Sequence, residues 1–145
     1  MLVPMRAILD AADKNGYAQG AFNVNAVCQV KAAVDVHQIL RSPAIIQGAD
    51  LANGFMGGRT DFANSTLEDK KAGAKNIGAA VKKYAADSDI PVALHLDHGT
   101  YEGCLKCIDA GFSSIMFDGS HYPIEENVEK TKELVKIAHE HGMSI

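Results

Sequence analysis

The sequence predicts an α/β fold in which the strands of a parallel sheet alternate with helices. Short apolar, strand-like runs alternate with longer segments of helical periodicity along the whole chain. Polar side chains follow several of these runs, at the strand ends where parallel sheets and closed barrels place their sites. The chain holds four strand–helix units and the start of a fifth, whereas an eight-unit barrel takes about 250 residues. We therefore expect the first half of a (β/α)8 barrel.

A leading helix and two strand–helix units are predicted in the first third of the chain. Residues 4–14 favour a short helix, and residues 20–25 alternate apolar and polar side chains as a strand does. Residues 26–40 are helical, and Pro43 marks the end of this helix because the residue before a proline avoids helical geometry. Residues 44–47 are the second predicted strand.

A long polar, glycine-rich stretch, residues 53–59, follows the second strand. Ser65 and Glu68 are expected to form a capping box, in which each side chain satisfies a free backbone amide of the other. The helix that this box opens should reach about Tyr84, although two glycines inside it lower its intrinsic stability.

Two further strand–helix units are predicted in the last third. Residues 91–96 and 114–117 are apolar, strand-like runs, and residues 101–110 between them are helical. Pro123 suits the first position of the last helix, and Gly142 ends it. The expected buried stripe of this helix consists of Ile124, Val128, Leu134, Val135 and Ala138.

Composition limits the class of protein. Of the 145 residues 47% are hydrophobic, which suits a folded globular protein, and residues 1–145 are expected to be the N-terminal part of a single barrel domain without an internal boundary. No stretch is long enough to span a membrane, and residues 1–6 lack the features of a signal peptide, so a cytoplasmic location is the default expectation. The net charge of −4, without a basic cluster, argues against nucleic acid or an anionic membrane surface as a partner.

The three cysteines are Cys28, Cys104 and Cys107. An odd number without a secretion signal does not predict a disulfide framework. Cys104 and Cys107 have the C-x-x-C spacing of zinc and redox sites, but the chain has no second cysteine pair, and both fall on one face of a predicted helix. Small apolar packing is the favoured interpretation.

Asp97 and His98 form the strongest candidate site. They directly follow the apolar run 91–96. A carboxylate beside a metal-binding imidazole can move a proton next to a Lewis acid. The alternative is an aspartate that caps the next helix beside a polar loop histidine. No lysine lies within an apolar strand, which favours metal-assisted carbonyl chemistry over a Schiff base.

The other polar residues at strand ends each have two interpretations. Asp118 either caps the following helix or lies in the outer shell of a metal site. Asn23 and Asn25 are either hydrogen-bond partners for a polyol or phosphate or plain strand-end polar groups. Ser120 is either a substrate contact or a turn residue at a helix start. His95, inside an apolar run, is interpreted as a core histidine.

These residues resemble a known family. The segments are Ala-Leu-His-Leu-Asp-His-Gly-Thr at 93–100, Cys-Ile-Asp-Ala-Gly-Phe-Ser-Ser-Ile-Met-Phe-Asp-Gly-Ser-His at 107–121, Gly-Ala-Phe-Asn-Val-Asn at 20–25 and Ser-Pro-Ala-Ile-Ile at 42–46. Together they are similar to the class II, zinc-dependent fructose-bisphosphate and tagatose-bisphosphate aldolases. The resemblance runs through the whole chain, and it implies a TIM barrel.

The resemblance also implies residue roles. Asp97 matches the family's catalytic acid/base, which exchanges a proton with the C4 hydroxyl of the sugar bisphosphate. His98 matches a zinc-ligating histidine, Asn23 matches a substrate contact, and Asp118 matches an acidic residue near the metal. The implied cofactor is Zn2+, which would polarise the ketone and stabilise the enediolate left after carbon–carbon cleavage.

The implied substrate is a ketose 1,6-bisphosphate. Fructose bisphosphate would give dihydroxyacetone phosphate and glyceraldehyde 3-phosphate, a step of glycolysis, and tagatose bisphosphate differs from it only in the configuration at C4. The resemblance further implies a homo-oligomer.

Two departures from the family pattern stand out. Ala49 lies where relatives commonly have a serine, and Asp50 follows it, so a substrate contact is lost or Asp50 alters the preference. Residues 143–145 begin another strand, whereas the family's remaining zinc histidines and phosphate loops would lie further on. A catalytic zinc usually needs three protein ligands, so residues 1–145 alone are expected to be inactive and to bind zinc weakly. The alternative function is a non-catalytic half-barrel that assembles with another chain.

Overall fold

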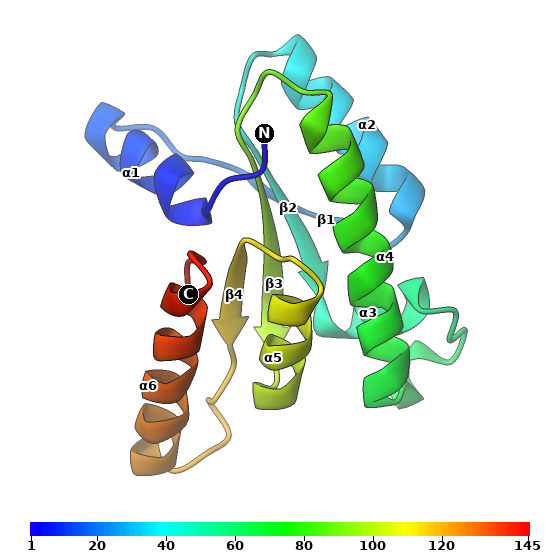
Figure 1. The fold of residues 1–145 in the computed structure, drawn as a ribbon, viewed down its shortest axis with the longest axis vertical. Helices are drawn as coiled ribbons and strands as arrows, with labels where there is room; N and C mark the ends of the chain where they lie inside the picture. Colours follow the sequence, from blue (N-terminus) through cyan, green and yellow to red (C-terminus); the bar gives the residue numbers. More distant parts are fainter.

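Four parallel strands form a single sheet, in the order in which they occur along the chain. The computed structural model describes all residues from 1 to 145. The strands are β1 (Ala21–Asn23), β2 (Ala44–Ala49), β3 (Val92–Gly99) and β4 (Ser114–Phe117). The arrows of β2, β3 and β4 point the same way in Figure 1, so their carboxyl ends meet at one edge of the sheet.

Helices connect the strands, as parallel pairing requires. They are α1 (Met5–Asn15), α2 (Val27–Ile39), α3 (Asp50–Met56), α4 (Leu67–Ala86), α5 (Tyr101–Asp109) and α6 (Ile124–Glu140), with a 3₁₀ turn at Phe62–Asn64. Figure 1 shows α2, α4 and α5 together beside the sheet, while α1 lies apart from them near the amino ends of the strands. The arrangement is that of the first half of a TIM barrel, as the sequence predicts.

Both faces of the sheet are buried at its centre, which is why the strands read as apolar runs. Ile46 and Leu94 belong to the main core, together with Ile77 of α4. On the other face Ile45 and Ala93 pack with Ile8 of α1 in a smaller cluster. The main core therefore joins the sheet to its helical layer, and α1 covers the other face at the amino ends of the strands.

The segment after β2 corrects one expectation. The helix α3 extends into the polar, glycine-rich stretch, as far as Met56, and packs closely against α4. At the contact, a Cβ on Gly73 would overlap the backbone carbonyl of Asn53, so only glycine lets the two helices come this close. Tertiary packing therefore decides this helix, because the local composition is that of a loop.

The helix start after this stretch corrects a second expectation by one residue. The capping box is formed by Thr66 and Asp69: Thr66 Oγ1 accepts a hydrogen bond from the Asp69 amide, and Asp69 Oδ2 accepts one from the Thr66 amide. Ser65 instead donates its hydroxyl hydrogen bond to the Phe62 carbonyl, at 2.8 Å. Ser65 with Glu68 and Thr66 with Asp69 both have the spacing of the motif. The Ser65 hydroxyl is bonded within the preceding 3₁₀ turn, so Thr66 forms the box.

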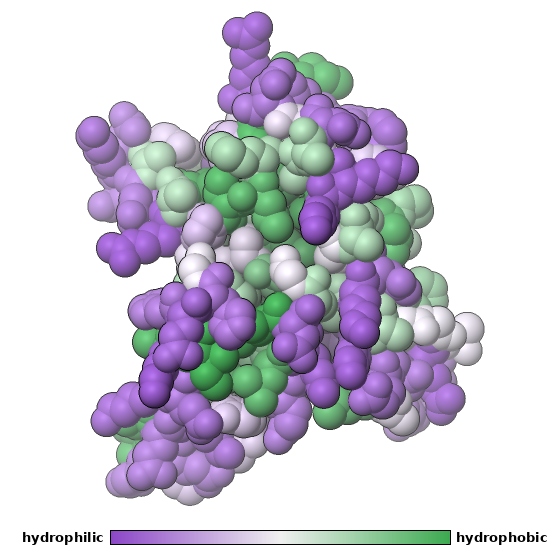
Figure 2. Space-filling model, viewed as in Figure 1, coloured by the Kyte–Doolittle hydropathy of each residue, from purple (hydrophilic) through white to green (hydrophobic).

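The last helix differs from its predicted stripe. Leu134 and Ala138 are buried, but Ile124 is 73% exposed and Val128 is 43% exposed. The helix packs on α5 and β4, and its two buried residues both belong to its carboxyl-terminal half. Figure 2 shows hydrophilic side chains over α1 and α6, with apolar side chains gathered between α5 and α6.

The remaining elements agree with the sequence prediction except at their ends. Strand β1 has three residues and not six, whereas β2 and β3 extend further toward their carboxyl ends than predicted. Ser144 pairs with Ser114 as a parallel bridge, so the last residues do begin a strand. None of the helices has the length and apolar character that a membrane span requires.

Candidate active site

The carboxyl end of β3 is distorted where it presents its acid and imidazole. The pairing of β3 with β4 changes register between Leu96 and Gly99, and His98 has a φ of 53°. Few residues other than glycine adopt this left-handed conformation. Bulges of this kind re-aim side chains beside active sites. Here the bulge turns the His98 imidazole toward β4.

The His98 ring is held by the carboxylate of the residue that directly follows the neighbouring strand β4. His98 Nδ1 lies 2.9 Å from Asp118 Oδ2, and its Nε2 lies 3.9 Å from Asp97 Oδ1. Asp118 Oδ1 also accepts hydrogen bonds from the amide and the hydroxyl of Ser120, at 3.1 and 2.6 Å. Asp118 thus fixes the ring through Nδ1 and leaves Nε2 directed to other partners.

These contacts shift both ionisation equilibria. The hydrogen bond that the ring donates to Asp118 and the negative charge of Asp97 raise the pKa of His98 above 6.5. The same hydrogen bond, with those from Ser120, holds the pKa of Asp118 well below its usual value. The Asp118 carboxylate is therefore ionised at neutral pH.

Asp97 is held from the opposite side by β2. Gln47 Nε2 donates to Asp97 Oδ2 at 2.9 Å and lies 3.1 Å from Asn23 Oδ1. Asn23 and Gln47 are register partners on β1 and β2, whereas Asp97 lies on β3 two residues beyond His95, the register partner of Gln47, so a polar line crosses the sheet diagonally to the carboxylate. Sequence analysis missed Gln47, whose signal is a lone amide at the end of an otherwise apolar strand.

Two other predicted residues lie outside this line. Asn25 follows β1 and is exposed; its amide donates to Gln29 Oε1 at 2.7 Å. Asp50, at the first turn of α3, pairs with Lys70 of α4, and their side chains are only 11% and 20% exposed. The structure therefore brings Asn23, Asp97, His98, Asp118 and Ser120 together and directs Asp50 to an internal ion pair.

The remaining candidates behave as core residues. His95 is 8% exposed, its Nδ1 lies 2.8 Å from Ser114 Oγ, and burial lowers its pKa below 6.5. Cys104 and Cys107 are buried, and burial raises the pKa of Cys104 to about 12. Such thiols stay protonated at neutral pH, as the packing interpretation of the C-x-x-C spacing requires.

The fit of a metal ion can be tested on these donors. A metal-binding histidine commonly donates its second ring nitrogen to a carboxylate, and His98 with Asp118 has this arrangement. No group of three or more histidine, cysteine, aspartate or glutamate side chains in the chain is arranged to hold a metal ion. The donor set therefore fits one ligand of a catalytic site and its orienting carboxylate.

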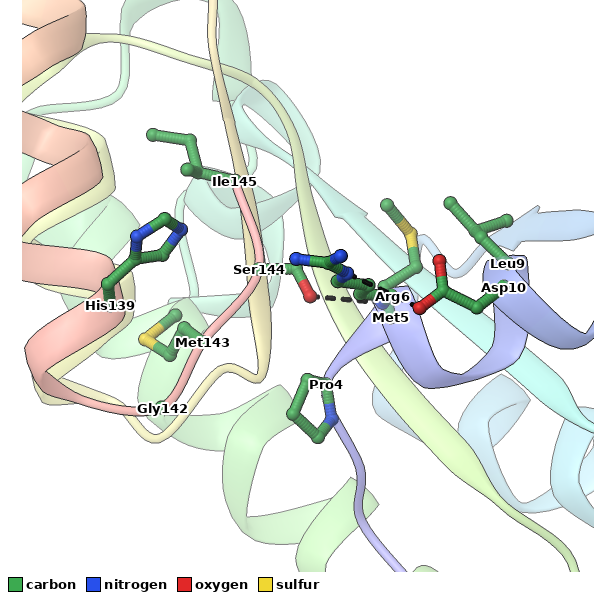
Figure 3. A pocket seen from close by; sticks show the side chains of 10 residues that line it. All are labelled: Pro4, Met5, Arg6, Leu9, Asp10, His139, Gly142, Met143, Ser144 and Ile145. Carbon is green, nitrogen blue, oxygen red and sulfur yellow. Dashed lines mark hydrogen bonds and ion pairs between the residues drawn. The ribbon is translucent and has the colours of Figure 1, made fainter.

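The largest cavity lies away from these residues. It has a volume of about 560 Å³ and opens between α1 and the end of the chain, as Figure 3 shows. Arg6 takes part in two contacts there: its amide donates to Ser144 Oγ at 3.0 Å, and its side chain pairs with Asp10. None of the candidate residues lines this cavity, so we do not assign it to the candidate site.

Comparisons with known proteins identify the family of the chain. The family pattern described as "Fructose-bisphosphate aldolase class-II" matches residues 3–145. The chain is 41% identical over 144 residues to fructose-bisphosphate aldolase of Streptococcus pyogenes serotype M3, covering 99% of this chain and 45% of that protein. It is also 41% identical over 144 residues to the 6-phospho-5-dehydro-2-deoxy-D-gluconate aldolase of Shouchella clausii, with the same coverage.

Solved structures give the same result. The YdjI aldolase of Escherichia coli K12 superposes with a TM-score of 0.76 at 29% identity, over 99% of this chain and 48% of that one. Fructose-bisphosphate aldolase of Campylobacter jejuni shares the fold with a TM-score of 0.83 at 24% identity, over 98% and 45%. The chain thus falls among aldolases built on a parallel β/α barrel. It belongs to the class II fructose-bisphosphate aldolase family, and it spans about half the length of the curated relatives that it matches.

Proposed function

We propose that the protein containing this chain catalyses the reversible, metal-dependent aldol cleavage of a ketose 1,6-bisphosphate, with fructose 1,6-bisphosphate as the first candidate. One observation carries the proposal. Asp97 lies at the carboxyl end of a parallel strand beside His98, whose ring is oriented by Asp118 through Nδ1. This arrangement joins a proton-transfer group to a prospective metal ligand.

Asp97 has the chemistry that the cleavage step needs. In cleavage the C4 hydroxyl gives its proton to the Asp97 carboxylate, the C3–C4 bond breaks, and C4 becomes the aldehyde carbon. The electron pair of the broken bond stays on the ketone half as an enediolate. A proton from solvent then converts this half to dihydroxyacetone phosphate, and Asp97 releases the proton that it took. In the synthetic direction, protonated Asp97 donates to the aldehyde oxygen.

The residues around Asp97 support this step. Gln47 holds one carboxylate oxygen and thereby fixes the direction in which the acid acts. A bound Zn2+ would polarise the ketone and carry the negative charge that develops there. His98 would supply one nitrogen ligand, and Asp118 and Ser120 would keep the ring in place.

Substrate contacts complete the proposal. Asn23 and Asn25 lie at the open end of β1, where their amides could meet substrate hydroxyl or phosphate oxygens. Ser120 is exposed and has a hydroxyl in the same region. Asp50 would act on preference only indirectly, through its ion pair with Lys70.

The number of metal ligands in residues 1–145 bears on whether this segment is active alone. Because the chain offers one metal ligand, His98, we propose that residues 1–145 alone lack aldolase activity, and that the complete protein works as a homo-oligomer in the cytoplasm. The second candidate function is that of a half-barrel that assembles with another chain, and the half-length match to the relatives supports testing it.

The test is an aldol-cleavage assay on the complete gene product, with metal analysis of the same sample. We expect fructose 1,6-bisphosphate to be cleaved, cleavage to stop on chelation, and added Zn2+ to restore it. Absence of cleavage of both fructose and tagatose bisphosphates by a zinc-loaded, folded protein would contradict the proposal. Sedimentation of residues 1–145 alone, with and without the remainder of the gene product supplied as a separate chain, tests the assembly alternative.

A further inference from the structure

The loop between β4 and α6, residues 118–123, carries two of the candidate residues, Asp118 and Ser120. It runs from the carboxyl end of β4 to the start of α6 (Figure 1). The other half of the site, Asp97 and His98, lies on β3, and the chain continues from there into α5. The 2.9 Å contact between His98 and Asp118 therefore depends on how the start of α5 and this loop are held together.

Backbone contacts fix the course of the loop at its start. The Asp118 amide donates to the Gly99 carbonyl at 2.9 Å. A Cβ on Gly119 would lie 2.4 Å from Asn127 Oδ1, so the chain passes close against α6 at a position that only glycine allows. The Tyr122 amide then donates to the Gly119 carbonyl at 3.0 Å and closes a turn. The side chain of Tyr122 is half-buried beyond this turn.

Three aromatic rings meet beside the loop. Phe117, the last residue of β4, stacks on Tyr122 with ring centroids 6.2 Å apart and an interplanar angle of 29°. Phe117 also forms a T-shaped pair with Tyr101, the first residue of α5, at 6.4 Å and 85°. Both geometries are favourable for aromatic pairs. The rings therefore connect the loop to the start of α5.

Lys130 of α6 places its ammonium against two of these rings. Its Nζ lies 5.0 Å from the centroid of the Tyr101 ring and 5.1 Å from that of Tyr122, within the range of about 6 Å over which a cation is attracted to an aromatic face. The Lys130 side chain is 30% exposed, and Glu126, one turn earlier, lies 3.6 Å from its Nζ. One cation thus joins the start of α5 to the loop before α6.

We propose that Lys130 is a positioning residue: its ammonium, held between the two tyrosine rings, keeps the loop in the place where Asp118 orients His98 for a metal ion. The inference rests on the proposed function and deepens it by naming a residue that acts on the metal centre through Asp118. Without the cation the two rings lose their common partner, and the His98 ring is directed less sharply. Partners that orient metal ligands change metal affinity by about 10- to 100-fold, and Lys130 acts one contact further away.

The test compares variants of the complete protein by zinc affinity, measured by competition with a chromophoric chelator, and by cleavage kinetics at saturating Zn2+. Lys130→Met removes the charge and keeps an apolar stem. We expect it to weaken zinc binding and lower kcat by about 3- to 10-fold, with KM within about twofold. Lys130→Arg retains a cation that stacks on aromatic faces and should restore both values to within about twofold of wild type. Thermal unfolding checks that each variant is folded.

Two further positions provide matched controls. Glu126→Gln removes the ion pair and leaves the cation and both rings, so zinc affinity and kcat should stay within about twofold of wild type. Tyr122→Phe keeps the aromatic face and should behave as wild type, whereas Tyr122→Leu should reproduce the loss. Lys130→Met added to Tyr122→Leu should cost little more, because the two residues act as one contact.

The outcomes separate the inference from the proposed function. Wild-type zinc affinity and kcat in folded Lys130→Met would overturn the positioning role, as would an equal loss in Glu126→Gln or in Lys130→Arg. Additive losses in the double variant would also contradict it, and a rise in KM alone would assign Lys130 to a substrate contact. If the zinc-loaded wild-type protein cleaves no ketose bisphosphate, the proposed function fails while the zinc affinities still decide the role of Lys130. A wild-type protein that binds no zinc overturns both.

Discussion

Gln47 donates a hydrogen bond from Nε2 to Asp97 Oδ2, at 2.9 Å, across the β2–β3 pair. The same nitrogen lies 3.1 Å from Asn23 Oδ1, so one amide joins three neighbouring strands at their carboxyl ends. An amide in this position orients the carboxylate without neutralising it. The direction of proton transfer therefore depends on β2 as well as on β3.

Replacement of Gln47 tests this relationship. In the complete protein, Gln47→Leu should lower kcat by about 10- to 100-fold, since a hydrogen bond to a charged group is worth about 1.5–3 kcal/mol. KM should change little, because Gln47 acts through Asp97. Steady-state kinetics with a thermal unfolding curve check this, and Gln47→Glu should not restore activity because it places a second carboxylate against Asp97. Equal loss of kcat and protein stability would assign Gln47 a structural role.

Asp97→Asn should keep the fold and the bound metal but lose most of the cleavage activity. Asparagine retains the shape and an acceptor oxygen but cannot take the C4 proton, and general acid–base groups contribute about 10²–10⁴-fold. Cleavage kinetics and metal analysis of the same preparation measure both properties. A variant with nearly wild-type turnover would remove Asp97 from the mechanism.

His98→Ala should lose metal and activity together. Its imidazole can offer Nε2 to a metal ion while Nδ1 is hydrogen-bonded to the Asp118 carboxylate. Metal content by elemental analysis and activity after Zn2+ titration provide the measurement, and His121→Ala, in the next loop, is the control. Wild-type zinc affinity in His98→Ala would show that His98 is only a loop residue.

The His98–Asp118 pair predicts a defined pH dependence. In metal-free protein, an NMR titration should place the pKa of His98 above 6.5, and Asp118→Asn should lower it. Because the folded-state pKa of His98 is raised, its contribution to stability is complete below about pH 6.5 and is lost as pH rises through the raised value. The pKa of Asp118 is lowered, so its contribution is present above about pH 3.8 and is lost as pH falls. A His98 pKa at or below 6.5 would contradict the observed contact.

The ion pair between Lys70 and Asp50 predicts a stability effect. Asp50→Ala leaves the Lys70 ammonium 20% exposed without its partner, and we expect a loss of about 1–3 kcal/mol, below that of a fully buried pair. The control is Asp35→Ala in the exposed Lys31–Asp35 pair, whose side chains are 57% and 52% exposed, with an expected loss under about 1 kcal/mol. Denaturant unfolding of the complete protein compares them; equal losses would mean that the Lys70–Asp50 contact adds nothing.

Local pattern was enough for most of the elements. The apolar runs of β2, β3 and β4 and the helix over Tyr101–Asp109 lie where periodicity places them. The α3 helix was missed because its stability comes from the contact with α4 and not from its own residues. The predicted capping box lies one residue early because two pairs of residues, Ser65 with Glu68 and Thr66 with Asp69, both have its spacing.

The candidate site divides in the same way. Asp97, His98 and Asp118 stand out in the sequence as candidates because acids and an imidazole directly after apolar strands are unusual. Gln47 is missed, since a lone amide at the end of an apolar run is a weak signal, and its role depends on the neighbouring strand bringing Asp97 within hydrogen-bond distance. The family resemblance offers Asp50 as a residue that alters substrate preference, because it follows Ala49 where relatives have a serine, but its side chain pairs with Lys70 of α4.

The sequence by itself determined the alternation of strands and helices, the family, and the residue types at the strand ends. These are properties of short segments, where periodicity and side-chain chemistry act over a few residues. Only the tertiary structure decided that the bulge in β3 turns His98 toward Asp118, that Gln47 bonds Asp97, and that Lys130 lies between two tyrosine rings. Each of these depends on strand register and helix packing, which bring together residues that are distant in the chain.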